Sequence, residues 1–247
     1  MPANYANPPM AEALCSFQFE PSQAWDWTIP GLVYAQVKEK FPVKREQQIL
    51  HFGVISGAAS STQNVSRIQF ISQDERSLVQ VGTDFFGVNV LPPYPNWMNF
   101  RVSIQTNLDI YTNIARPQSV KQINLRFINK IEIPSAVSTE SLSLDRYLKV
   151  LPGIPMELHH HKINNFIQRV ELSVENATGV LVLQSGSLNS ENDEYASFLL
   201  DLDFVSTLTE AFPVSEVGKR VDRAHDEIEL AFEASITDAS RLLFKGK

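Results

Sequence analysis

The longest alternation of apolar and polar side chains in the chain runs over residues 121–133 and stops at Pro134. From Ile123 to Ile133 the odd positions are apolar except for Asn129, and even positions, among them Arg126, are mainly polar. A period of two residues is typical of a β-strand with one buried face. The pattern therefore predicts a central strand that directs Asn129 toward the core and Arg126 away from it.

Asn129 and Arg126 each allow two interpretations. A buried amide without hydrogen-bond partners costs about 1–3 kcal/mol, so Asn129 is either a structural pin or part of a binding site. On the polar face, Arg126 lies near Asn124 and Lys130. A guanidinium beside an amide suits an anion, a nucleotide phosphate or a peptide carboxylate, and the alternative is an ordinary solvated sheet face.

The same reasoning predicts eight further strands and three main helices. Alternating or short apolar runs bounded by turn residues predict strands at 11–19, 47–55, 65–71, 77–82, 86–91, 163–173, 179–186 and 197–205. Apolar residues at helical spacing predict helices over 30–41, over 97–115 and after Ser215, with a short restart near Asp238. Thr28, Asn96 and Ser215 are the expected N-caps. Residues 56–64 are small and polar and predict a mobile loop.

This order of elements predicts an α+β fold. We expect antiparallel sheet segments, or one bent sheet, covered by three main helices. Patterning weakens over 135–162, which divides the chain into a strand-helix-meander-helix-strand half at 1–134, a connector, and a three-stranded half with a carboxy-terminal helix at 163–247. One continuous domain is the alternative. Strands and helices recur in both halves, which is consistent with a distant duplication.

The composition limits the classes of protein to which this chain can belong. The chain has 247 residues, of which 43% are hydrophobic and 15 are Phe, which excludes a disordered chain. A net charge of -7 gives no general attraction to nucleic acid or to anionic membranes, so we expect no nonspecific nucleic-acid binding. No stretch approaches the ~20 apolar residues of a membrane span, and the amino terminus lacks the pattern of a secretory signal. A single cysteine, Cys15, fits a cytoplasmic protein.

Two histidine sites are candidates for chemistry. His159, His160 and His161 are consecutive, but adjacent side chains on an extended chain point in alternating directions, so we predict no metal there and no cofactor elsewhere. His225 lies on a predicted helix with Asp222 three residues before it and Glu229 four after. A neighbouring carboxylate would raise the pKa of this imidazole and orient it as a base, whereas a solvated helix face explains the same residues. No short catalytic motif is present.

A proline-rich segment at 91–97, Leu-Pro-Pro-Tyr-Pro-Asn-Trp, links a predicted strand to a predicted helix. Prolines hold an extended conformation at low entropic cost, so Tyr94 and Trp97 are candidate docking residues. The alternative is a stiff connection that Asn96 ends by capping the helix. Glu12, at the start of the first strand, is a further candidate binding residue.

Five motifs together resemble a sporadically distributed prokaryotic family of uncharacterised proteins of similar length. They are Asn-Pro-Pro-Met-Ala-Glu at 7–12, Thr-Ile-Pro-Gly-Leu-Val-Tyr at 28–34, the segment at 91–97, Leu-Arg-Phe-Ile-Asn-Lys-Ile-Glu-Ile-Pro at 125–134, and the His- and Phe-containing helix at 223–238. The resemblance covers nearly the whole chain. It implies a bacterial or archaeal protein and transfers no catalytic residue.

These observations favour a non-catalytic binding or interaction protein that acts on a protein partner or a small ligand. The patchy distribution of the family favours an accessory role in a prokaryotic defence or toxin-antitoxin system. The alternative is a hydrolase or nuclease with a dispersed site around His225 or His159 to His161. The candidate binding residues are Arg126, Asn129, Glu12, Tyr94, Trp97 and His225. The sequence makes no prediction of oligomeric state.

Overall fold

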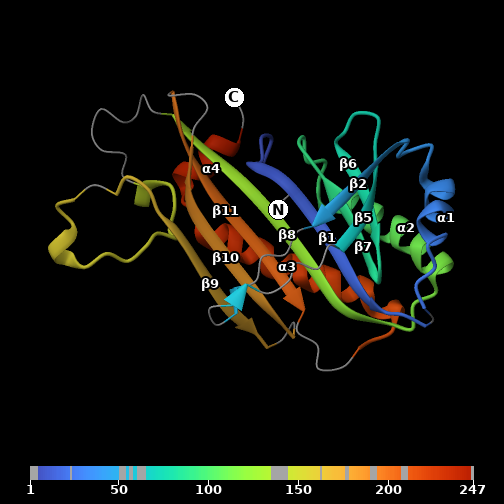
Figure 1. The fold of residues 1–247 in the computed structure, drawn as a ribbon. Coiled ribbons are helices and arrows are strands. Elements are labelled where there is room, and N and C mark those ends of the chain that lie inside the picture. The colour runs from blue at the N-terminus through green and yellow to red at the C-terminus, as the bar shows by residue number, and fades with distance from the viewer. Residues whose placement is uncertain are drawn as a thin grey trace.

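A computed structural model describes residues 5–22, 24–49, 54–55, 58–59, 65–134, 144–161, 163–175, 178–189, 194–206 and 211–245. Nine strands form one antiparallel sheet in the order β2-β5-β6-β7-β1-β8-β11-β10-β9 (Figure 1). The strands are β1 (Met10–Glu20), β2 (Val43–Ile49), β5 (Val65–Ile71), β6 (Ser77–Gly82), β7 (Phe85–Val90), β8 (Ser119–Pro134), β9 (Ile167–Val174), β10 (Gly179–Leu188) and β11 (Tyr195–Ser206). A separate small hairpin pairs β3 (Val54–Ile55) with β4 (Ala58–Ala59).

Helices cover one face of this sheet, which confirms the predicted α+β class with three main helices. They are α1 (Ile29–Val37), α2 (Trp97–Ala115), α3 (Val217–Ser235) and the short α4 (Asp238–Phe244). α1 packs on β5 and α2, α2 on β7, and α3 on β8, β10 and β11. Figure 1 shows α3 running behind β8, β10 and β11, while the near face of the sheet carries no helix formed by the described residues.

The two halves of the sheet repeat one topology. In the first half, β1 pairs with β7, the last strand of the meander β5-β6-β7, and α2 follows. In the second half, β8 pairs with β11, the last strand of the meander β9-β10-β11, and α3 follows. β1 and β8 pair with each other at the centre, so the sheet is continuous from one half to the other.

The first half contains a unit that the described part of the second half lacks. α1 and β2 lie between β1 and β5 in the chain, and β2 pairs with the outer edge of β5. Between β8 and β9, the described residues form only the single-turn 3-10 helices η2 (Leu144–Arg146) and η3 (Met156–Leu158). β9, the counterpart of β5, is therefore the terminal strand of the sheet.

β8 confirms the predicted central strand and extends it to residues 119–134. Its odd positions from Ile123 to Ile133 are buried beneath the helices, and Asn129 is fully buried among them. Arg126 projects from the opposite face, where its side chain is 39% exposed. The alternation therefore places the two residues on opposite faces, as predicted.

The helix ends differ in part from the predicted caps. The Asn96 side chain accepts the Asn99 N–H at 2.9 Å, which confirms the cap of α2. The Thr28 hydroxyl makes no capping bond, and α1 ends at Val37 rather than Phe41. Ser215 is not the cap either, because it lies inside the 3-10 turn η4 (Val214–Glu216) that precedes α3.

Several predicted segments fall partly outside the described residues. The strand expected at 47–55 is observed as β2, which begins earlier, and as the two residues of β3. Of the loop predicted at 56–64, only residues 58–59 are described, and of the connector at 135–162, residues 135–143 and 162 are not. No helix among the described residues is long and apolar enough to cross a membrane.

Candidate functional site

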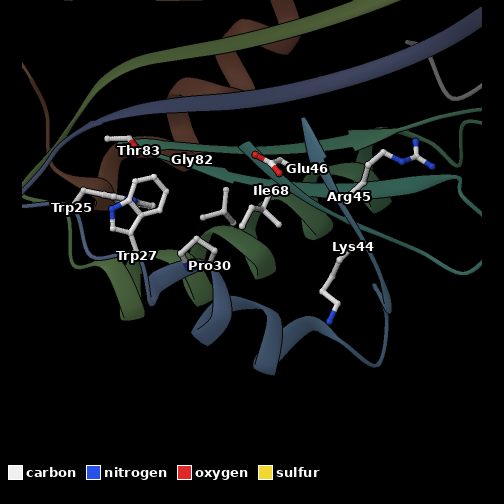
Figure 2. A pocket seen from close by; sticks show the side chains of 10 residues that line it. Trp25, Trp27, Pro30, Lys44, Arg45, Glu46, Ile68, Gly82 and Thr83 are labelled. Carbon is white, nitrogen blue, oxygen red and sulfur yellow. The ribbon is translucent and has the colours of Figure 1, made fainter. Parts of the chain in front are cut away.

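A groove of about 390 Å³ lies between α1 and the outer strand β2. Its lining combines aromatic and apolar side chains with three charged residues: Trp25, Trp27, Pro30, Lys44, Arg45, Glu46, Ile68, Val81, Gly82 and Thr83. Figure 2 shows the two tryptophans at one end, Lys44 at the other, and Pro30, Ile68 and Glu46 between them. Its volume falls in the range of roughly 300–1,000 Å³ that is usual for ligand pockets.

The tryptophan end of the groove is built by the short link between β1 and α1. The Asp26 carboxylate accepts the backbone N–H of Thr28 at 2.8 Å, and the Asp26 carbonyl accepts that of Ile29 at 3.0 Å, so the link forms a tight turn. The Thr28 N–H also lowers the pKa of Asp26. The turn sets the rings of Trp25 and Trp27 edge to face, with centroids 6.3 Å apart at 81°.

The floor and the opposite end of the groove are held by the core. Pro30 and Val81 are buried, and Ile68 packs against the hydrophobic core. Lys44 lies with its ammonium 4.4 Å from the centroid of the Tyr34 ring, which is a cation-π distance. The Tyr34 hydroxyl in turn donates to the Pro42 carbonyl at 3.1 Å. These contacts give the groove a fixed apolar base and a positioned cation.

Trp27 is the most unusual member of the groove because 76% of its side chain is exposed. Tryptophan carries a large apolar ring and dominates the free energy of association where it is buried against a partner. Glu46 on β2 is also exposed and lies over the middle of the groove in Figure 2. An exposed indole and a carboxylate over one apolar floor suit a long side chain with an apolar stem and a positive charge, such as lysine or arginine.

Three predicted site residues pack together at the margin of the core, where His225 is buried and Tyr94 and Trp97 are partly buried. The ring of Trp97 stacks on His225 with centroids 3.8 Å apart, and Phe127 lies 6.1 Å from the same imidazole. Tyr94 packs edge-on against Phe127 and Phe100. The proline-rich segment therefore anchors α2 and α3 to β8, which is the stiff connection that the sequence allowed.

The environment of His225 contradicts the expectation that a carboxylate raises its pKa. The residue is 4% exposed, and burial lowers its pKa to about 3. Its Nδ1 atom lies 3.9 Å from carboxylate oxygens of Asp226 and Glu229, beyond hydrogen-bond distance. Asp222 forms an ion pair with Arg101 at 2.7 Å instead. A buried, weakly basic imidazole is poorly suited to general-base catalysis at neutral pH.

Arg126 and Glu12 belong to a cross-strand network on the helix-free face. Arg126 donates two hydrogen bonds to Asp201, at 2.8 and 2.6 Å, and the Asp201 side chain is only 5% exposed. Asn89 donates to Glu12 and accepts from Gln80 at 2.8 Å. Hydrogen bonding to Asp201 raises the pKa of Arg126. Since its charge is already met by a carboxylate, Arg126 is less available to an anionic ligand.

Asn129 is a structural pin between strands. Its side-chain N–H groups donate to the carbonyl of Leu200 at 3.0 Å and to that of Phe127 at 3.3 Å. The residue lies on the helix side of β8, away from the Arg126 network and from the groove. The six predicted binding residues thus divide between the core with its margin and the polar sheet face.

The consecutive histidines lie on the surface. His159, His160 and His161 are exposed, and the Nε2 atom of His159 lies 3.0 Å from the Ile154 carbonyl. The rings of His160 and His161 lie 3.9 Å apart. Within the described ranges, no group of three or more His, Cys, Asp or Glu residues is arranged to hold a metal ion.

A larger depression of about 910 Å³ lies near the end of β8, between residues 7–11 and α4. Lys130, Tyr195 and Leu242 contribute to its lining. It adjoins, along the chain, residues 1–4, 135–143 and 246–247, which lie outside the described structure. The groove between α1 and β2 is the stronger candidate, because aromatic and charged side chains lie together over an apolar floor there.

Sequence reasoning missed this groove. The Trp25-Asp26-Trp27 segment reads as a plain link between a strand and a helix, although two tryptophans in a polar link are a detectable signal of exposed aromatic surface. Nothing in the sequence marked Lys44 and Glu46 as groove residues, because the charged sequence of β2 is equally typical of a protected edge strand.

No protein-family model matches the chain, and no curated protein matches it. The family resemblance and the defence or toxin-antitoxin setting therefore stay predictions.

Proposed function

We propose that this protein is a non-catalytic binding protein that holds a side chain of a protein partner in the groove between α1 and β2. The observation that carries the proposal is the exposed indole of Trp27 at the mouth of an apolar groove. Burying apolar surface contributes roughly 25 cal/mol per Å², so covering a tryptophan is a substantial share of the free energy of a protein–protein contact.

The indoles and Glu46 suit a long basic side chain of the partner, whereas Lys44 and Arg45 suit an acidic group further along the same segment. Glu46 offers a carboxylate, and the indole faces offer the electron-rich surface that cations prefer. Lys44 at the far end favours an acidic or carbonyl group a short distance along the same segment. The hydrolase or nuclease alternative has less support, since His225 is enclosed in the core and His159 to His161 lie on the surface.

Affinity capture from the native cell tests the proposal with four versions of the chain. The parent chain, Trp27→Ala, Glu46→Gln and Leu230→Ala serve as baits, and the captured proteins are identified by mass spectrometry. Leu230 is 66% exposed on α3, so its truncation is a matched control for the loss of an exposed apolar side chain elsewhere.

We expect a partner that the parent and Leu230→Ala capture equally, that Glu46→Gln captures less, and that Trp27→Ala loses at least about tenfold, equivalent to 1.4 kcal/mol. A photo-crosslinking residue at position 27 should then join covalently to that partner. If Trp27→Ala captured the partner as well as the parent chain does, or if the residue at position 27 crosslinked to no protein, the proposal would be contradicted.

A further inference from the structure

The outer edge of β9 differs from that of β2 at the other end of the sheet. β2 has the sequence Val-Lys-Arg-Glu-Gln-Gln-Ile, and its central residues are charged and exposed. Such charges protect an edge strand against pairing with another chain. β9 has the sequence Ile-Gln-Arg-Val-Glu-Leu-Ser-Val, in which Ile167, Val170 and Leu172 are 75%, 42% and 46% exposed. β9 is therefore an edge of mixed apolar and charged residues with no described strand beside it.

The register of the sheet assigns the faces of β9. Val170 lies opposite Leu183, which lies opposite Leu202, which in turn lies opposite Phe127 beneath α3. Even-numbered residues of β9 therefore lie on the helix side of the sheet, and Arg169 and Glu171 lie on the helix-free side. In the first half, α1 covers the equivalent residues of β5, whereas Val170 and Leu172 have no described helix over them.

We infer that β9 is a dimer interface, at which two copies of this chain pair their β9 strands antiparallel about a twofold axis through Val170. The sequence of the strand complements itself in this register. Arg169 of each copy lies opposite Glu171 of the other, which gives two ion pairs, and Val170 lies opposite its own symmetry mate.

Neighbouring registers are less favourable. Only shifts that change the pairing by two residues keep the same faces together. One such shift sets Arg169 opposite Arg169, and the other sets Glu171 opposite Glu171, and like charges directly opposite each other are destabilising. The chosen register also sets Phe166 opposite Val174, so both ends of the interface are apolar on the helix side.

The pairing extends each nine-stranded sheet into that of its partner. A twofold axis perpendicular to the sheet keeps the helix layers of both copies on the same side, since Val170 meets Val170 on that side. The exposed side chains of the two β9 strands then pack side by side across the new strand pair. In the isolated chain, Arg169 and Glu171 pair within their own strand at 2.7 Å, with side chains 54% and 58% exposed, and are thus free to exchange partners.

Charge reversal tests the register directly, because both side chains are more than half exposed and contribute little to the fold. Sedimentation equilibrium of the full chain over a range of concentrations measures the dissociation constant of the parent, of Arg169→Glu, of Glu171→Arg and of the double variant. Circular dichroism and urea unfolding confirm that each variant folds.

We expect a reversible dimer for the parent and at least about a tenfold weaker association for each single variant, because both ion pairs become like-charge pairs. The double variant should dimerise as the parent does, and an equimolar mixture of the two single variants should form a heterodimer. The interface is independent of the groove, so Trp27→Ala should dimerise normally.

A parent chain that stays monomeric at every concentration would overturn the inference. Single variants that associate as tightly as the parent would also overturn it, and so would a mixture of the single variants that fails to form a heterodimer.

Discussion

β5 and β9 hold equivalent positions in the two halves of the sheet, yet their side chains have different environments. On β5, Phe70 is 1% exposed, and its ring lies 5.3 Å from that of Tyr34 on α1. On β9, Leu172 is 46% exposed and has no described helix over it. The contrast shows that the α1-β2 unit seals one end of the sheet, and it leaves the other end as surface that a second chain can cover.

The largest effect on stability should come from shortening the side chain of Phe70 on β5, and the matched change on β9 is Leu172→Ala. Phe70→Ala should lower the free energy of unfolding by about 3–5 kcal/mol, because it leaves a cavity in the core. Leu172→Ala should cost at most about 1 kcal/mol, since much of the side chain already contacts water. Urea unfolding at the lowest usable protein concentration measures both. Equal losses would show that β9 is as well covered as β5.

A second prediction compares Asn129 with Arg126 on opposite faces of β8. Asn129→Ala should cost about 1–3 kcal/mol, because two carbonyls lose their donor in the core. Although an exposed arginine would be nearly neutral, Arg126→Ala should cost a comparable amount, since it leaves the buried carboxylate of Asp201 without its ion pair.

A double-mutant cycle with Asp201 distinguishes the ion pair of Arg126 from the hydrogen bonds of Asn129. Adding Asp201→Ala to Arg126→Ala should recover part of the loss, whereas adding it to Asn129→Ala should give roughly additive effects. Urea unfolding supplies the four free energies of each cycle. Strict additivity of Arg126→Ala and Asp201→Ala would contradict the ion pair as a source of stability.

The third prediction concerns pH, and both groups involved lie in the second half of the sheet or on its helix. Burial lowers the pKa of His225 to about 3, so the unfolded chain binds this proton first and stability falls as pH drops below 6.5. Burial raises the pKa of Asp203 to about 6, so the folded chain binds its proton first, and stability rises as pH drops from 6 toward 3.8.

The two contributions oppose each other between about pH 4 and 6, each with a limit of 1.36 kcal/mol per pH unit. His225→Phe should therefore become more stable relative to the parent as the pH falls through this range, and Asp203→Asn less stable. Urea midpoints at pH 4, 5, 6 and 7 measure the difference. Parallel profiles for the parent and both variants would show that neither group is perturbed.

The smallest effect on stability should come from the groove. Trp27→Ala should change the free energy of unfolding by less than about 0.5 kcal/mol, because the side chain is largely exposed. Together with a loss of partner capture, this result would assign the indole to binding. A loss of more than about 2 kcal/mol would instead make Trp27 a structural residue and weaken the proposed function.

The sequence by itself determined the elements and their faces. Alternation over residues 121–133 was sufficient to predict β8 and to place Asn129 and Arg126 on opposite sides, because the side-chain period of a strand is a local property of the backbone. Helical spacing and the Asn96 cap likewise located α2. These signals depend only on neighbours in the chain.

Tertiary structure alone decided which of those residues meet. Asp201 lies 75 residues from Arg126 in the chain, and its partnership turned a predicted solvated arginine into half of a partly buried ion pair. His225 on α3 stacks on Trp97, the first residue of α2. The groove and the bare edge of β9 depend on the order of nine strands in space. These features depend on which distant segments pair with each other, and the local periodicity of the sequence does not predict that pairing.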